Sequence, residues 1–160
     1  MCGDGIVRTL EEVEEGAERL AELYRRAGLD DGGGRYPSLE QWKKILAYPS
    51  GKKLYTVSFY GFDREKLMAA VGSDSAARDH EAWEQRTGAR QIFSGAVKGC
   101  IIGSQGQTVD WNFMEIKEFE TTDALIRAAT DPYKMEFLKN KQETFTTQQW
   151  SLLVGPDEFV

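Results

Sequence analysis

The spacing of apolar residues changes near residue 53 and divides the chain into a helical part and a mixed part. Up to that point the apolar positions recur every three or four residues, as they do along one face of a helix. The segment from Thr9 to Ala27 has this spacing, with glutamates on its other faces, and a short helix is predicted to begin with a capping box at Ser38. We therefore expect an N-terminal helical extension over residues 1–52.

Strand-like runs alternate with helical spacing over residues 53–160. Runs rich in β-branched and aromatic residues predict four strands, and helical spacing follows the first and the third of them. The second helical region restarts at Asp131-Pro132, because proline fits the first turn of a helix. This order predicts an α+β domain with a ferredoxin-like βαββαβ fold and an antiparallel four-stranded sheet. The predicted strands are Leu54 to Phe62, Arg90 to Ile102, Val109 to Phe119 and Gln148 to Val154, with a hairpin loop over residues 103–108.

Both faces of the predicted sheet carry apolar side chains. The neighbours Ile92 and Phe93 point to opposite faces of one strand, as Phe113 and Met114 do in the next. A single layer of helices covers one face only, so we expect the other face to be buried against a second copy of the chain in a homodimer. The alternative is that the N-terminal helices fold beneath the sheet and leave a monomer.

The composition is that of an ordinary globular protein. Of 160 residues, 41% are apolar and 29% are charged, and the formal net charge of −6 disfavours nucleic acid or an anionic membrane as a partner. No apolar run approaches the roughly 20 residues of a membrane span, and the N-terminus lacks the pattern of a secretion signal, so we expect a cytoplasmic protein. Cys2 and Cys100 have no neighbouring metal ligands, and phosphate-binding and dinucleotide-binding motifs are missing, so we expect neither a metal nor a cofactor.

Three short motifs are similar to motifs of the dimeric α/β-barrel superfamily. They are Tyr48-Pro49-Ser50-Gly51 before the first strand, Arg86-Thr87-Gly88-Ala89-Arg90 before the second, and Asp131-Pro132-Tyr133 in the second helical region. From the first strand to its end, the chain resembles this superfamily and, within it, a family of small uncharacterised single-domain proteins. The resemblance implies a small-molecule cavity between sheet and helices in each subunit. Members of the superfamily include cofactor-free monooxygenases, polyketide cyclases, lactone isomerases and haem enzymes.

His80 is the only histidine and the first candidate for acid–base catalysis. Its ordinary pKa suits proton transfer near neutrality, and it lies one helical turn from Trp83. If this helix face looks into the cavity, His80 can move a proton on an aromatic or polyketide-like substrate beside the indole. The alternative is a structural histidine that is hydrogen-bonded to solvent or to a neighbour.

A polar and aromatic run begins the third strand. Adjacent residues of a strand point to opposite faces, so Asp110 and Asn112 share one face and Trp111 takes the other. We predict that Asp110 and Asn112 polarise a carbonyl or orient an enolate, and that Trp111 forms an apolar wall. The alternative for Trp111 is packing in the core or in an interface.

Two phenols and a guanidinium complete the predicted substrate-binding set. Tyr60 and Tyr133 can donate a hydrogen bond to a developing oxyanion, and Arg86 can hold a carboxylate. Alternatively, Tyr133 packs the second helical region onto the sheet and Arg86 complements the C-terminus of its helix.

These residues favour a cofactor-independent enzyme that acts on a hydrophobic aromatic or polyketide-like small molecule by proton transfer, cyclisation or monooxygenation. The main alternative is a small-ligand-binding or stress-associated protein that performs no reaction. A third possibility is an interaction module that uses the acidic N-terminal helix. A catalyst needs a titratable group with a shifted pKa in its cavity, whereas a binding protein needs only apolar walls and a few fixed donors.

Overall fold

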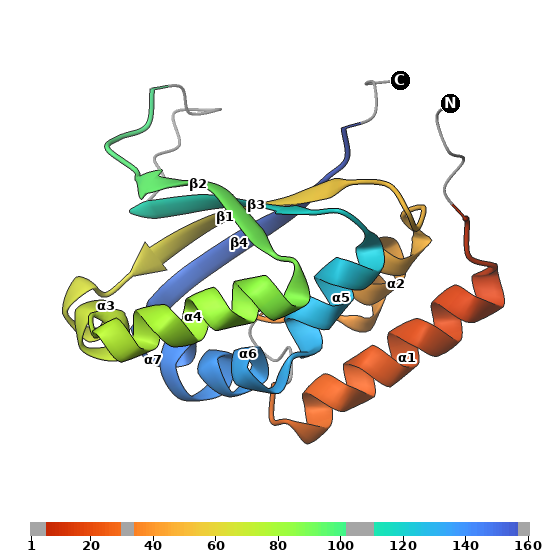
Figure 1. Cartoon of the computed structure of the whole chain (residues 1–160), viewed down its shortest axis with the longest axis horizontal. Coiled ribbons are helices and arrows are strands. Elements are labelled where there is room, and N and C mark those ends of the chain that lie inside the picture. The colour runs from red at the N-terminus through yellow and green to blue at the C-terminus, as the bar shows by residue number, and fades with distance from the viewer. Residues whose placement is uncertain (1–5, 30–33, 102–110, 157–160) are drawn as a thin grey trace.

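The four strands form one antiparallel sheet with every helix on the same side of it (Figure 1). The computed structural model describes residues 6–29, 34–101 and 111–156. The strand order is β2-β3-β1-β4, and β1 pairs with both β3 and β4. The predicted α+β ferredoxin-like fold is therefore confirmed. The strands are β1 (Leu54–Phe62), β2 (Arg90–Ala96), β3 (Phe113–Phe119) and β4 (Thr146–Val154).

Several helices begin at residues whose side chains cap the first turn. Thr9 and Ser38 form capping boxes, and Ser73 and Thr121 each accept a hydrogen bond from the first turn of the helix that follows. Asp131 caps a helix that has Pro132 in its first turn. The helices are α1 (Leu10–Arg26), α2 (Leu39–Ala47), α3 (Arg64–Val71), α4 (Asp74–Thr87), α5 (Thr122–Thr130), α6 (Pro132–Phe137), the π-helical η2 (Leu138–Gln142) and α7 (Glu143–Phe145).

The second and third strands of the chain, β2 and β3, are shorter than predicted. β2 ends at Ala96, whereas the predicted strand ended at Ile102. Just beyond β2, the Val97 N–H donates one further hydrogen bond of 3.0 Å to the Asn112 carbonyl. A bulge between Gln91 and Phe93 also shifts its register against β3. β2 is an edge strand, so it has a partner strand on one side only, and helices cover it poorly. Both features limit its length. The hairpin loop predicted for 103–108 lies outside the described residues.

Two hydrophobic clusters join the helices to the sheet and to each other. The first lies between the sheet and helices α4 and α5, and it includes Leu54, Trp83 and Phe119. The second joins α1 and α2 to the outer side of α5 and η2, with Trp42 and Leu138 among its members. The N-terminal extension therefore forms an outer layer on the helices, as Figure 1 shows for α1.

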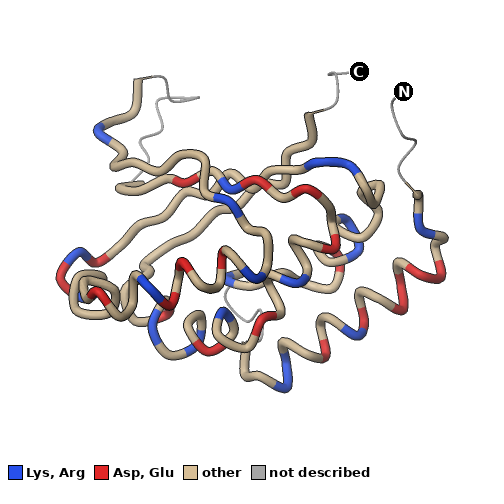
Figure 2. Tube along the Cα trace, in the orientation of Figure 1, with Lys and Arg blue, Asp and Glu red and all other residues tan. Residues whose placement is uncertain are grey.

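Polar contacts fasten the N-terminal extension to the same layer. The Tyr24 hydroxyl donates a hydrogen bond of 2.7 Å to the Ala129 carbonyl, and the Tyr36 hydroxyl donates to the Glu143 carboxylate. Figure 2 shows acidic residues along the first half of α1 and basic residues among them in its second half, as expected of a solvated helix face. In the described part of the chain, none of the helices is long and apolar enough to cross a membrane.

The far face of the sheet, which we call the open face, is apolar and exposed. Phe93, Trp150 and Leu152 are 54%, 56% and 39% exposed there. The ring of Trp111 lies 6.5 Å from that of Trp150 and 6.3 Å from that of Phe59, which places Trp111 on the open face too. The alternative in which the N-terminal helices cover this face is wrong, because those helices pack on the opposite side of the molecule.

Candidate functional site

Charged side chains of β3 lie on the helix-covered face of the sheet. Glu115 and Lys117 alternate with the open-face residues of this strand, so they point toward the helices. The Lys117 ammonium and the Tyr60 hydroxyl donate hydrogen bonds of 3.0 and 2.9 Å to the same carboxylate oxygen of Glu115. The side chains of Lys117 and Glu115 are only 8% and 14% exposed. Burial of this pair is tolerable because each charge has a partner.

Helix α4 adds an indole, an imidazole and a second carboxylate. Residues three and four apart on a helix share a face, so His80, Trp83 and Glu84 lie together. The Trp83 ring is buried, and its N–H donates a hydrogen bond of 3.1 Å to the Ala128 carbonyl on α5. The His80 ring lies 5.1 Å from the Trp83 ring, and its Nε2 lies 3.5 Å from a carboxylate oxygen of Glu84.

Helix α6 adds a second lysine from below. Asp131 and Pro132 fix the start of this short helix, and its third residue is Lys134. The Lys134 nitrogen lies 4.9 Å from the centre of the Trp83 ring, and the Lys117 nitrogen lies 5.4 Å from the same centre. We call this group the lysine–glutamate cluster; its members are Tyr60, His80, Trp83, Glu84, Glu115, Lys117 and Lys134.

Burial lowers the pKa values of two basic groups of the cluster, Lys134 and His80. Burial, followed by the nearby Lys117 charge, lowers the pKa of Lys134 to about 7. Burial, followed by the charges of Lys117 and Lys134, lowers the pKa of His80 to about 4. Near neutral pH His80 is therefore uncharged, and Lys134 is divided between amine and ammonium.

The acidic members respond in opposite directions. Burial would raise the pKa of Glu115, but the Lys117 ammonium, assisted by Lys134 and Tyr60, holds it below its usual range. Glu115 is thus a carboxylate at neutral pH. Burial raises the pKa of Glu84, which lacks so close a cation. Burial also raises the pKa of Tyr60 well above its ordinary value, so its phenol keeps its proton.

The cluster reaches solvent beside the edge strand β2. Gln91 and Ser94 of β2 pair with Lys117 and Glu115 of β3, and both are exposed. The His80 side chain is 37% exposed on the opposite wall. Exposed side chains of α4 and β2 therefore border the cluster on both sides.

Three of the predicted site residues come together in the cluster, namely Tyr60, His80 and Trp83. Arg86 and Tyr133 lie one turn along α4 and at the start of α6. The Arg86 guanidinium makes two hydrogen bonds of 2.8 and 2.7 Å with the Asp131 carboxylate and lies 5.8 Å from the centre of the Tyr133 ring. This ion pair fastens α4 to α6 and so helps to position Lys134.

The other predicted residues lie elsewhere. Trp111 belongs to the open face, separated from the cluster by the sheet. The Asn112 side chain accepts a hydrogen bond of 2.9 Å from the Phe62 N–H and donates one of 2.8 Å to the Phe62 carbonyl, so it extends the pairing of β1 and β3. Asp110 lies outside the described residues, so its role stays a prediction.

Four members of the cluster were missed by the sequence reasoning. Glu115 and Lys117 carried a usable signal, because they share the parity of Phe113 and Phe119 and so fall on the face that helices must cover. Glu84 could also have been found, since it follows His80 by four residues. Lys134 had no such signal, because its position depends on how α6 packs against α4.

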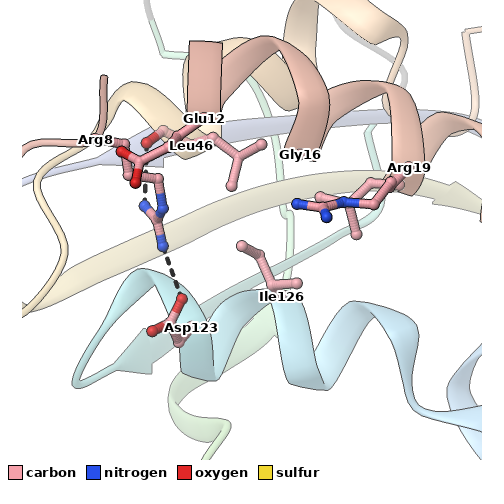
Figure 3. A pocket seen from close by; sticks show the side chains of 8 residues that line it. Arg8, Glu12, Gly16, Arg19, Leu46, Asp123 and Ile126 are labelled. Atoms are coloured by element: carbon pink, nitrogen blue, oxygen red, sulfur yellow. Dashed lines mark hydrogen bonds and ion pairs between the residues drawn. The ribbon is translucent and has the colours of Figure 1, made fainter. Parts of the chain in front are cut away.

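A separate groove of about 390 Å³ lies between α1, α2 and α5 (Figure 3). The Arg8 guanidinium closes one end of it, with hydrogen bonds of 3.1 Å to the Leu46 carbonyl and 2.7 Å to the Asp123 carboxylate. No member of the lysine–glutamate cluster lines this groove.

Within the described ranges, no group of three or more histidine, cysteine, aspartate and glutamate residues could hold a metal ion.

Comparisons with known proteins agree with the architecture. The sequence matches no protein-family model and no curated protein. A protein of unknown function from Rhodopseudomonas palustris has a similar structure, with a TM-score of 0.62 and 18% identity over 79% of this chain and 98% of that chain. Its methylated form gives a TM-score of 0.61 at 18% identity, over 79% of this chain and 96% of that chain.

A further solved structure is more distant. It is a dabb family protein with a ferredoxin-like fold from Mesorhizobium loti, with a TM-score of 0.39 and 12% identity over 66% of this chain and 98% of that chain. The likeness to the Rhodopseudomonas palustris protein supports the fold, and identity this low assigns neither a family nor an activity.

Proposed function

We propose that this protein is a cofactor-independent enzyme that transfers protons on a hydrophobic, aromatic or polyketide-like small molecule bearing a carbonyl group. The reaction takes place at the lysine–glutamate cluster. The observation that carries the proposal is that Lys117 and Lys134 lie over the same Trp83 ring from two elements. Glu115 is held beside them by hydrogen bonds from Lys117 and Tyr60. Clusters of titratable groups with shifted pKa values are typical of catalytic sites and are not needed for ligand binding alone.

The members of the cluster have complementary roles in this reaction. Glu115 is the general base that takes a proton from the carbon next to the carbonyl, a role that contributes about 10²–10⁴-fold to a rate. The Lys117 ammonium lies beside it and stabilises the negative oxygen of the enolate. The buried Trp83 ring holds Lys117 and Lys134 close together, and Tyr60 fixes the orientation of the Glu115 carboxylate.

The proposal includes a homodimer formed through the open face. Exposed aromatic and aliphatic side chains cover this face, including Phe93, Trp150 and Leu152. Apolar surfaces of this kind are commonly buried in symmetric association. In such a dimer the two clusters face outward, on the far side of each sheet from the interface.

Solvent deuterium exchange on simple ketones tests the proposed reaction, whatever the natural substrate is. Acetophenone and phenylacetone serve as aryl ketone probes, and NMR follows the loss of the protons next to the carbonyl in D₂O. We expect the protein to accelerate exchange and Glu115→Gln to lower the acceleration about 100-fold.

Glu120→Gln is the matched control, because Glu120 is an exposed carboxylate close to the same strand. It should exchange the probes like the unmodified protein. Tight binding of a probe with no acceleration of exchange would favour a ligand-binding protein and would contradict the proposed activity.

A further inference from the structure

We propose that Lys134 is the nucleophile of this site and forms a Schiff base with the carbonyl carbon of the substrate. This inference rests on the proposed function for the chemical class of the substrate, an aldehyde or ketone. It adds a covalent intermediate and names the atom that forms it, the side-chain nitrogen of Lys134.

The setting of Lys134 differs from that of Lys117. The Lys117 ammonium donates to Glu115 at 3.0 Å, so a carboxylate holds it in its charged form. In the part of the chain that the structure describes, the Lys134 nitrogen has no ion-pair partner and lies instead over two aromatic rings. Its distances to the centres of the Trp83 and Phe137 rings are 4.9 and 5.4 Å.

The balance of the groups around Lys134 favours its neutral form. The faces of the Trp83 and Phe137 rings attract the ammonium, but burial removes water from the nitrogen and the Lys117 ammonium of β3 opposes a second positive charge. Glu115 of β3 and Glu84 of α4 act in the opposite direction, and the His80 imidazole of α4 is uncharged at neutral pH. The balance is a pKa of about 7, with burial as the largest cause. A desolvated lysine beside another cation is a known route to an amine nucleophile.

The reaction is balanced within the site and needs no oxidant or reductant. The electron pair of the Lys134 nitrogen attacks the carbonyl carbon, and the electrons of the C=O bond move to the oxygen. The nitrogen loses a proton and the oxygen gains one, which gives a carbinolamine. The oxygen then takes a second proton from solvent and leaves as water, while the nitrogen electron pair forms a protonated C=N bond.

The Schiff base explains the position of Glu115. A protonated C=N bond withdraws electrons from the neighbouring carbon more strongly than a carbonyl does. The Glu115 carboxylate then takes a proton from that carbon, and the product is an enamine. Return of the proton followed by addition of water releases the carbonyl compound and restores the Lys134 amine.

Reductive trapping tests this inference on the full-length protein. The protein is mixed with benzaldehyde and sodium cyanoborohydride at pH 7, and the benzylated lysines are located by peptide mass spectrometry. At this pH about half of Lys134 is amine, whereas an exposed lysine with a pKa near 10.4 has less than about one part in a thousand. Since a less basic amine is also less nucleophilic, we expect Lys134 to be labelled at least about tenfold faster than any exposed lysine.

Two variants define the specificity of the label. Lys134→Met should lose the fast phase of labelling, and Lys141→Met, which removes an exposed lysine of η2, should keep it. Labelling spread over the exposed lysines with no preference for Lys134 would overturn the inference. The distribution of label among the lysines is measured on the unmodified protein, so this test holds even if a variant fails to fold.

The exchange assay separates the two proposals. Accelerated exchange that survives in Lys134→Met and is lost in Glu115→Gln would retain the proposed function and overturn the Schiff base. Fast labelling of Lys134 without any acceleration of exchange would retain the nucleophile and contradict the proposed function.

Discussion

Replacing Lys134 by methionine should make the protein more stable at neutral pH and less sensitive to alkaline pH. Methionine fills a similar volume over the Trp83 ring and carries no charge. The buried amine has a pKa of about 7, against an ordinary value of 10.5. At about 1.4 kcal/mol per pKa unit, this difference corresponds to an upper value of about 5 kcal/mol.

The sign of the effect follows from proton uptake. Above pH 10.5 the lysine is neutral in both states. As the pH falls toward 7, the unfolded chain binds a proton and the folded chain does not, so the free energy of unfolding decreases. Below about pH 7 both states are protonated and the penalty stays constant. Relaxation around the charge reduces the observed penalty, so we expect Lys134→Met to gain about 2–5 kcal/mol at pH 7 and much less at pH 10.

Urea denaturation between pH 6 and pH 10, followed by tryptophan fluorescence, measures this difference. Lys141→Met is the matched control, because it removes an exposed lysine and should leave the pH dependence unchanged. A stability difference between Lys134→Met and the unmodified protein that is the same at pH 7 and pH 10 would refute the reasoning.

Two other features give separate tests. The pKa of His80 is about 4 against an ordinary 6.5, so the free energy of unfolding should decrease as the pH falls from 6.5 to 4. Because the side chain is 37% exposed, we expect a decrease of about 1 kcal/mol. Urea denaturation of His80→Gln should lack this decrease. We also expect native mass spectrometry to show the proposed dimer for the unmodified protein and a folded monomer for Trp150→Glu on the open face. Leu10→Glu, at an exposed position of α1, should remain dimeric. A monomeric unmodified protein would contradict the proposed dimer.

Local signals in the sequence were sufficient for most of the fold. The capping box at Ser38 predicted the start of its helix because capping depends on a few neighbouring residues. The first strand has its predicted bounds, Leu54–Phe62, because it is central and strongly β-forming. The end of the edge strand β2 and the start of β3, which pairs with it, were missed, since the length of this pair depends on pairing and cover, which the local composition does not encode.

The candidate site was predictable only where one element defines it. The spacing of His80 and Trp83 on one helix placed them together correctly. Asn112 was predicted to orient an enolate, and strand parity gave no indication that its amide pairs with the Phe62 backbone. Lys134 depends on the packing of α6 beneath α4, a tertiary contact between segments about 50 residues apart, for which a single sequence holds no local signal.

The ionisation of Lys134 is the most direct test of a reactive group in the cluster. Heteronuclear NMR of the lysine side chains, with Lys134 assigned from its absence in Lys134→Met, gives its titration curve between pH 5 and pH 11. We expect a midpoint near pH 7, separate from the other lysines. A midpoint near the ordinary 10.5 would mean that the amine is fully charged at neutral pH, and it would contradict a catalytic cluster at this position.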